Sequence, residues 1–442
     1  ASQMAFARLG LETLDLLGLE PPVENERATD DKLDGIPEWF IGPLMSSLVC
    51  HEVGHTLGLR HNFKASSLYT MAEINSEDVR GNKPFTSSVM DYNPVNFNMD
   101  AGEVQGDFAM IGIGPYDSWA IEYGYTFGDV NEVLSKSNLP EHAYLTDEDT
   151  SGPDPLAKRY DFSKDPLDYA QNQMRIVAKL REDLLEQFVE DGDSWSKARR
   201  GYETTLRMQA GAASMMADWI GGAHVNRNKK GDFGDEDVPP IQVVPAQQQR
   251  AALAFIIDSI FDDEGYGLSP ELLTHFNVDK WYEGGGDTGE PTWQIHDRIL
   301  GTQASLLSGI LAPSRLRMVY DNEFLVPADE DAFTLVEIFD TLMDTIYKDL
   351  YVENDSPWTT RNPMISSIDR NLQAEMTDRL IDLATGRVRM FRTVRTLALG
   401  KVRGLHDSLQ QISRKNLDPY TQAHLDDMQE RLQKALDAVY TM

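Results

Sequence analysis

The chain has 442 residues, with 40 basic against 72 acidic side chains and a formal net charge of −32 at pH 7. A surface this acidic repels phosphate backbones and anionic lipid headgroups, so we expect neither nucleic acid nor a membrane surface as a partner. The longest nearly unbroken apolar stretch, residues 251–257, is too short to span a bilayer, and the one cysteine, Cys50, excludes an intrachain disulfide.

The first predicted elements are two helices separated by a loop. Residues 4–17 have the apolar spacing of a short amphipathic helix, and an acidic, proline-containing loop follows over residues 20–34. Pro43 indicates the start of the second helix, because proline is favoured at the first helical position. This helix is predicted to run to about Leu57 and to end at Gly58, since glycine adopts a left-handed turn readily.

A loop-rich stretch follows, in which residues 116–121 predict one further helix. Residues 146–155 combine acidic residues with glycine and proline, which is typical of a surface loop at a domain boundary. The loop could hold calcium, but its spacing fits no EF-hand loop, so a solvated loop is the preferred interpretation.

From about residue 168 onward apolar residues recur at helical spacing. Asp418 and Pro419 are a favourable cap and first residue for the last of these helices. The stripes predict a helix-bundle core rather than a cofactor site. The predicted helices cover residues 174–188, 202–219, 245–260, 299–311, 333–346, 376–394 and 425–439.

One segment carries a pattern of metal-binding residues: residues 51–61 read HEVGHTLGLRH and match H-E-x-x-H-x-x-G-x-x-H. His51 and His55 are four residues apart, so on a helix both imidazoles project from one face and can bind one zinc ion. Glu52 is rotated by about 100° from His51, which places its carboxylate beside a metal-bound water rather than on the metal.

The third ligand is predicted from the turn after this helix. Gly58 permits a sharp turn that brings His61 round to the metal and leaves a fourth position to water. An open fourth position is the mark of a catalytic zinc site. Glu122 is an alternative third ligand, in the manner of thermolysin-like enzymes, but His61 at this spacing is favoured. We therefore expect one catalytic Zn²⁺ as the cofactor.

A second motif agrees with the first. Residues 88–92 read SVMDY, which resembles the S-x-M-x-Y turn that passes beneath the zinc in metzincin peptidases, the Met-turn. The resemblance implies that Met90 packs under the ligands without coordinating the metal. It also implies that Tyr92 approaches the metal or donates a hydrogen bond to a tetrahedral oxyanion.

With these motifs the chain resembles the bacterial Met-zincin family of zinc-dependent metallopeptidases. The active-site helix of that family continues as GLRHNF, which is the sequence of residues 58–63 here. Residues 116–125 and 221–232 are further similar stretches. The resemblance implies a zinc metalloendopeptidase that acts on a peptide or protein substrate, in a secreted or periplasmic location.

The resemblance also bears on the organisation of the chain. Metzincins carry a twisted sheet before the active-site helix, whereas the 50 residues before His51 contain no convincing strand. We therefore expect a mainly α fold, with a metzincin-like zinc-binding catalytic subdomain over residues 1–150 that has little or no sheet, and a helical domain over residues 151–442. The chain resembles the C-terminal portion of a longer family member, and the N-terminal segment of the same precursor is a candidate partner.

The predicted reaction is hydrolysis of a peptide bond by a metal-activated water, with Glu52 as general base. Tyr92 is the second candidate catalytic residue. Two alternatives stay open. The first is a non-catalytic helical binding or scaffold module with a structural or vestigial zinc site. The second is a zinc hydrolase that acts on something other than peptides.

Overall fold

The computed structural model describes residues 32–33, 36–99, 104–232, 238–281, 290–352 and 357–440, and the predicted helix over residues 4–17 lies outside them. The fold is mainly α, as predicted. The chain divides into two compact units. The site unit comprises residues 1–218, 223–242 and 270–291, and the bundle unit comprises residues 219–222, 243–269 and 292–442. The site unit extends beyond residue 150, and the division into domains at that residue stays a prediction.

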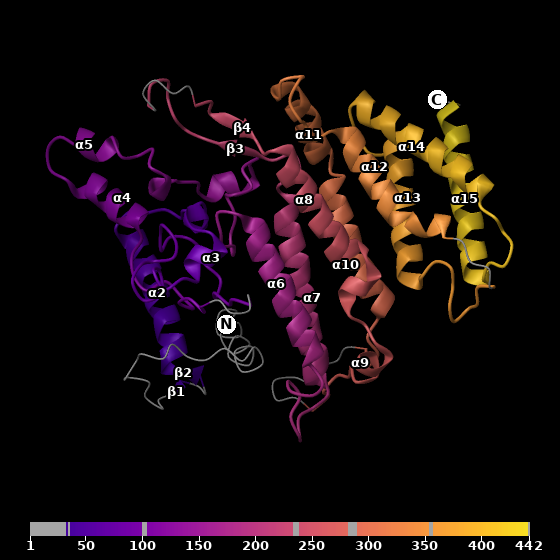
Figure 1. Ribbon diagram of the computed structural model, residues 1–442, viewed down its shortest axis with the longest axis horizontal. Coiled ribbons are helices and arrows are strands. Elements are labelled where there is room, and N and C mark those ends of the chain that lie inside the picture. The colour runs from indigo at the N-terminus through magenta and orange to yellow at the C-terminus, as the bar shows by residue number, and fades with distance from the viewer. Residues whose placement is uncertain are drawn as a thin grey trace. The chain divides into compact units, whose positions relative to one another are not determined.

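The site unit begins with two very short strands. Strand β1 (Lys32–Leu33) and strand β2 (Ile36–Pro37) pair antiparallel and lead directly into helix α2 (Glu38–Thr56), the indigo helix of Figure 1. This hairpin agrees with the expectation of little sheet before the metal-binding motif.

Helix α2 begins at Glu38, so the predicted start at Pro43 is wrong. Phe40 is fully buried, and its ring packs against the rings of Trp39 and Phe108. This packing holds the first turn in place although Pro43 cannot donate the usual hydrogen bond to the carbonyl four residues earlier. The predicted end is confirmed, because Leu57 caps the helix and Gly58 has a φ of 91°.

Short helices joined by loops follow α2. The predicted helix over residues 116–121 is confirmed by α4, and the predicted loop over residues 146–155 contains the 3-10 turn η3. The elements of this region are η1 (Ala65–Leu68), α3 (Met71–Ile74), α4 (Pro115–Tyr125), α5 (Asn131–Leu134), η2 (Pro140–His142) and η3 (Asp147–Ser151).

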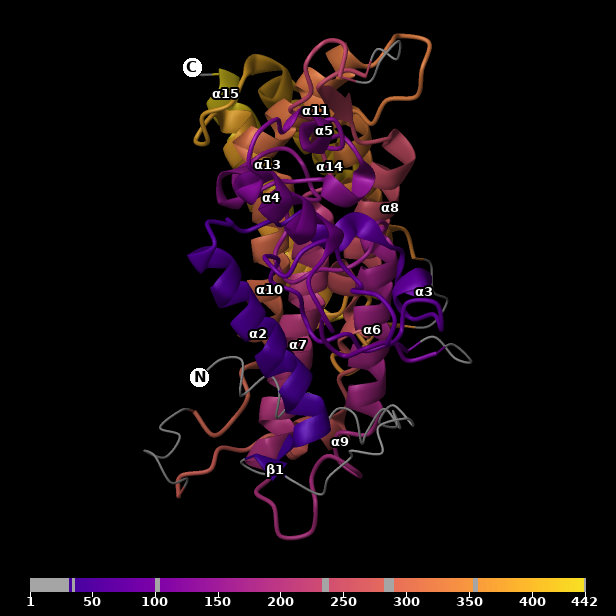
Figure 2. The same ribbon diagram turned by 90° about the vertical axis from the view of Figure 1, so that its left-hand side faces the viewer.

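Two long helices complete the core of the site unit. Helix α7 (Ser196–Ala217) runs alongside α6 (Pro166–Glu182) in both views, as Figures 1 and 2 show. Both helices are amphipathic, as predicted. Where they contact each other, Arg181 of α6 donates hydrogen bonds to Thr205 and Gln209 of α7. Helix α9 (Pro270–Thr274) and strand β3 (Ala223–Val225), which pairs with β4 (Ile241–Val243), are the remaining elements around this unit.

The bundle unit consists of helices, and α13 packs against α10, α14 and α15. Most of the predicted helices of this region are present. The elements are α8 (Ala246–Ile256), the π-helical turn η4 (Ile257–Phe261), η5 (Asp263–Tyr266), α10 (Ile295–Ile310), α11 (Pro313–Leu325), α12 (Leu335–Ile346), η6 (Lys348–Tyr351), α13 (Ser367–Thr385), α14 (Arg392–Gln411) and α15 (Pro419–Tyr440).

The predicted single helix over residues 376–394 is wrong, because two helices share this stretch. Helix α13 ends at Gly386, whose φ of 78° is left-handed, and Arg395 of α14 donates a hydrogen bond to the carbonyl of Ala384 in the last turn. A glycine in this conformation ends a helix. The predicted cap of α15 is confirmed, since Asp418 accepts hydrogen bonds from the backbone N–H groups of the first turn.

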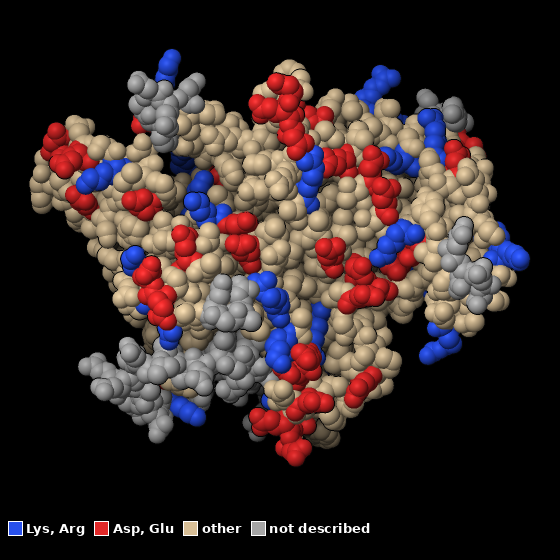
Figure 3. Space-filling model, in the orientation of Figure 1, with Lys and Arg blue, Asp and Glu red and all other residues tan. Residues whose placement is uncertain are grey.

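The charged side chains of the surface include both signs, as the composition indicates. On the face that Figure 3 shows, lysine and arginine side chains are interspersed with acidic ones. Among the helices of the described residues, none is both long enough and apolar enough to cross a membrane.

Candidate metal centre

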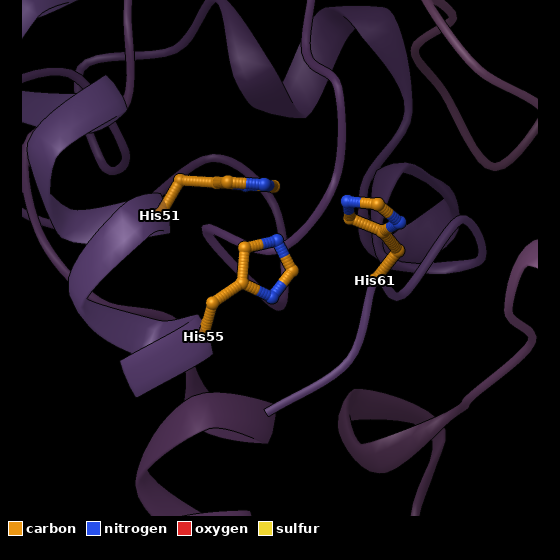
Figure 4. A group of neighbouring side chains, drawn as sticks. All are labelled: His51, His55 and His61. Atoms are coloured by element: carbon orange, nitrogen blue, oxygen red, sulfur yellow. The ribbon is translucent and has the colours of Figure 1, made fainter. Parts of the chain in front are cut away.

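Helix α2 and the turn after it bring three imidazoles together, as Figure 4 shows. The ring centroids of His51 and His55 on the helix are 4.8 Å apart, and that of His61 lies 5.3 Å and 4.8 Å from them. One nitrogen from each ring lies within 4.8 Å of the other two. The left-handed turn at Gly58 directs the chain back so that His61 faces the helix.

Hydrogen bonds at the outer nitrogens set the tautomer of two of these rings. The Nδ1 atom of His51 lies 2.8 Å from the carbonyl oxygen of Val89, and that of His55 lies 3.0 Å from the carbonyl oxygen of Leu59. A carbonyl oxygen can only accept, so Nδ1 carries the proton and Nε2 keeps its lone pair for a metal ion.

His61 is held by a carboxylate instead. Its Nδ1 atom donates to Asp147 at 2.8 Å, and its Nε2 atom lies 2.9 Å from the phenol oxygen of Tyr92. Arg159 donates to the second oxygen of Asp147 at 3.0 Å. Burial raises the pKa of the Asp147 carboxyl, but the hydrogen bonds from His61 and Arg159 outweigh burial and lower it. A carboxylate behind a histidine ligand is the usual outer partner at zinc sites.

Asp147 belongs to η3, in the stretch predicted as a solvated loop. Most of the loop is at least partly exposed, as predicted, and several of its carboxylates also bind basic side chains. Arg60 forms two hydrogen bonds with Glu148, of 3.0 and 2.6 Å, and Arg227 donates to Asp149 at 2.7 Å. The loop therefore supports the metal centre through ion pairs.

The Met-turn, residues 88–92, lies directly beneath α2. Met90 is fully buried, and a Cβ atom at Gly54 would overlap its sulfur. Gly54 is therefore required for the helix to approach the turn, a role that the motif analysis missed. The available signal was a glycine in the middle of a helix, where it costs about 1 kcal/mol relative to alanine.

Asp117 of α4 is a further residue that the motif analysis left without a role. Its buried carboxylate accepts hydrogen bonds from the Ser88 hydroxyl and, at 2.8 Å each, from the N–H groups of Val89 and Gly114. Burial raises the pKa of Asp117, although these hydrogen bonds oppose the shift. The start of α4 is thereby fixed to the Met-turn.

The electrostatics of the centre favour a neutral His51 and a protonated Tyr92. Burial, and then the neighbouring His55 and His61, lower the pKa of His51, which keeps the metal-binding neutral form. Burial raises the pKa of Tyr92. The charge of Glu52, which is exposed, raises the pKa of both His51 and Tyr92.

Among the described residues, the side chains that can hold one metal ion are His51, His55 and His61. Glu122, the alternative third ligand, is exposed on α4 and is not in this group. Three neutral imidazoles with their outer N–H groups bonded to oxygen fit a zinc ion with an open position.

Two imidazoles on one helix turn, a third after a glycine turn and a methionine beneath them define a metal centre of the metzincin type. A family model described as Met-zincin matches residues 34–354. The chain belongs to the Met-zincin family. No curated protein and no solved structure matches it.

Proposed function

We propose that the protein is a zinc-dependent metalloendopeptidase. The observation that carries this proposal is the convergence of three imidazole nitrogens within 4.8 Å, on the motif that also supplies Glu52. Nitrogens around a tetrahedral zinc ion are about 3.3 Å apart, because each Zn–N bond is about 2.0–2.1 Å long. The side chains would therefore close by at most about 1.5 Å on binding the ion, which rotation of histidine rings can supply.

The roles of the chain's own residues follow from their positions. Zinc, when bound, supplies Lewis-acid chemistry, because it lowers the pKa of water to about 7 and polarises a carbonyl group. Glu52 accepts the proton of the attacking water and delivers it to the amine that leaves. The Tyr92 phenol, which stays protonated, donates a hydrogen bond to the carbonyl oxygen as that oxygen becomes negative.

Family membership supports the remaining parts of the proposal. The substrate is a peptide or protein, and the location is periplasmic or extracellular. The formal net charge of −32 disfavours nucleic acid as the substrate instead.

The test is digestion of a broad peptide library by the zinc-loaded protein, with and without a chelator. Glu52→Gln should retain zinc and lose about 10²–10⁴-fold in kcat/KM, the usual contribution of a general base. Glu122→Gln is the matched control, because this glutamate is exposed on α4 and is the alternative ligand. It should keep both zinc and activity. Full cleavage by Glu52→Gln would refute Glu52 as the general base. A zinc-loaded wild-type protein that cleaves no peptide would refute the proposed peptidase activity.

A further inference from the structure

A continuous chain of hydrogen bonds runs from the first metal-binding histidine to a buried carboxylate on another helix. The Nδ1–H group of His51 donates to the Val89 carbonyl at 2.8 Å. That carbonyl shares its peptide group with the N–H of Met90, which donates to the Ser88 hydroxyl oxygen at 2.9 Å. The Ser88 hydroxyl in turn donates to Asp117.

Every group in this chain donates in the same direction, toward the carboxylate. Hydrogen bonds aligned in this way polarise one another, and the effect is larger where water is excluded. Ser88 is fully buried, Met90 is fully buried, and Asp117 is 2% exposed. The negative charge of Asp117 therefore acts on the His51 imidazole through the Val89–Met90 peptide group.

The carboxylate itself is held in a fixed orientation. One oxygen accepts from the Ser88 hydroxyl, and the other accepts from the backbone N–H groups of Val89 and Gly114. A side chain at Gly114 would overlap the Ser87 carbonyl, so the backbone there approaches the Met-turn as closely as a glycine permits. Asp117 consequently fixes the position of the Met-turn from below.

We propose that Asp117 is a positioning residue of the metal centre. Through Ser88 and the Val89–Met90 peptide it fixes the tautomer and orientation of His51 and makes its Nε2 atom a stronger ligand. It is the indirect counterpart of Asp147, which holds His61 by a direct hydrogen bond of 2.8 Å. This inference rests on the proposed function only in requiring that His51 bind the metal.

The test measures the zinc dissociation constant of the full chain by competition with a chromophoric chelator. Asp117→Asn should weaken zinc binding about tenfold, the lower end of the range for outer partners of metal-bound histidines. Ser88→Ala interrupts the same chain while leaving the hydrogen bonds from Val89 and Gly114 to Asp117, and it should weaken binding to a similar extent. The double variant should be no weaker than the worse single variant by more than about twofold, since both changes break one chain.

A second readout separates positioning from general stability. In the metal-free protein, the NMR resonance of the His51 Nδ1 proton should shift in both variants, whereas that of His55, which donates to Leu59, should not. Asp107→Asn is the matched control: this half-buried carboxylate also accepts a backbone N–H, from Gly81 at 2.7 Å, but has no bond to the Met-turn. It should leave zinc affinity and the His51 resonance unchanged.

The outcomes are distinct. Zinc affinity and a His51 resonance that stay at their wild-type values in Ser88→Ala and Asp117→Asn would overturn the inference and leave the proposed peptidase standing. Equal losses in Asp107→Asn would also overturn it, because they would indicate general destabilisation. If Asp117→Asn does not fold, Ser88→Ala decides alone. A wild-type protein that binds no zinc would overturn both the inference and the proposed function.

Discussion

The loops around the metal centre and the C-terminal helices α13–α15 are ordered by different interactions. Around the metal centre many of the buried side chains are polar and form hydrogen bonds to backbone or other side-chain groups, among them Asn62, Ser66, Ser88, Asp91, Asp117 and Asp161. In α13–α15 the buried faces are mainly apolar, with residues such as Leu372, Leu380, Val402, Leu425 and Leu432.

Because of this difference, the polar network mainly determines the geometry of the metal centre, whereas the apolar helices mainly determine the stability of the fold. Hydrogen bonds are directional, so a buried polar network fixes the angle of each histidine, but any unpaired member of the network carries a large desolvation cost. Apolar burial is non-directional and contributes mainly free energy. We therefore expect changes in α13–α15 to alter stability alone, and changes near the metal centre to alter metal binding as well.

The largest expected effect is in the bundle unit. Leu380 of α13 is fully buried, so Leu380→Ala should lower the free energy of unfolding by about 2–5 kcal/mol, measured by urea denaturation. Zinc affinity should stay unchanged. Leu325→Ala is the matched control, because Leu325 is 58% exposed and should cost little. A loss of zinc affinity in Leu380→Ala would contradict the expectation that changes in α13–α15 alter stability alone.

The next effect depends on pH. Burial raises the pKa of Asp161 to about 7, although a hydrogen bond from Ser66 and the charge of Lys158 oppose the shift. The pKa of Asp91 is also raised, first by burial and then by repulsion from Asp161. Burial raises the pKa of nearby Tyr169 as well. Between about pH 4 and pH 7 the folded state then holds a proton that the unfolded chain releases, so stability falls as pH rises through this window.

Asp161→Asn removes this contribution. Relative to the variant, the metal-free wild type should lose on the order of a few kcal/mol in unfolding free energy between pH 4.5 and 7.5. Urea denaturation across this range measures the difference. A difference between wild type and variant that stays constant over the range would contradict the assigned burial of the carboxyl.

A smaller effect is expected at the contact between α2 and the Met-turn. Gly54→Ala places a methyl group against the buried Met90 sulfur, so it should cost about 1–3 kcal/mol and also weaken zinc binding. Gly42→Ala on the same helix is the control, because its Cβ atom would meet only Glu38, at 4.0 Å. Equal stability and equal zinc affinity of the two variants would show that the Met-turn does not pack against α2 at Gly54.

The smallest expected effect is a gain. Gly404 lies within α14, and a Cβ atom there would have no neighbour within 4 Å. Gly404→Ala should therefore raise the free energy of unfolding by about 0.5–1 kcal/mol, since alanine loses less backbone entropy in a helix. Thermal unfolding measures the gain, and a lower midpoint than that of the wild type would mean that α14 is packed more tightly than described.

The sequence predicted what depends on local spacing. The face shared by His51 and His55, the end of α2 at Gly58 and the cap at Asp418 all follow from contacts within a few residues. The start of α2 could not be predicted, because the packing of Phe40 overrides the preference of proline for a first turn.

Contacts distant in sequence were also beyond prediction. Asp147 is 86 residues from His61, and Asp117 is 29 residues from Ser88, so no short motif contains either pair. Only the tertiary fold brings Asp147 to His61 and Asp117 to the Met-turn. The prediction of a single helix over residues 376–394 was wrong for a different reason. Gly386 ends a helix only when its neighbours permit a left-handed turn.

The most direct test of the metal centre is X-ray absorption at the zinc edge of the loaded protein. We predict three imidazole nitrogens and one further light atom at about 2.0–2.1 Å from the zinc ion, with one imidazole lost in His61→Ala. A sulfur neighbour at about 2.3 Å, from Cys50 or Met90, or a wild-type site with fewer than three imidazoles, would contradict this prediction.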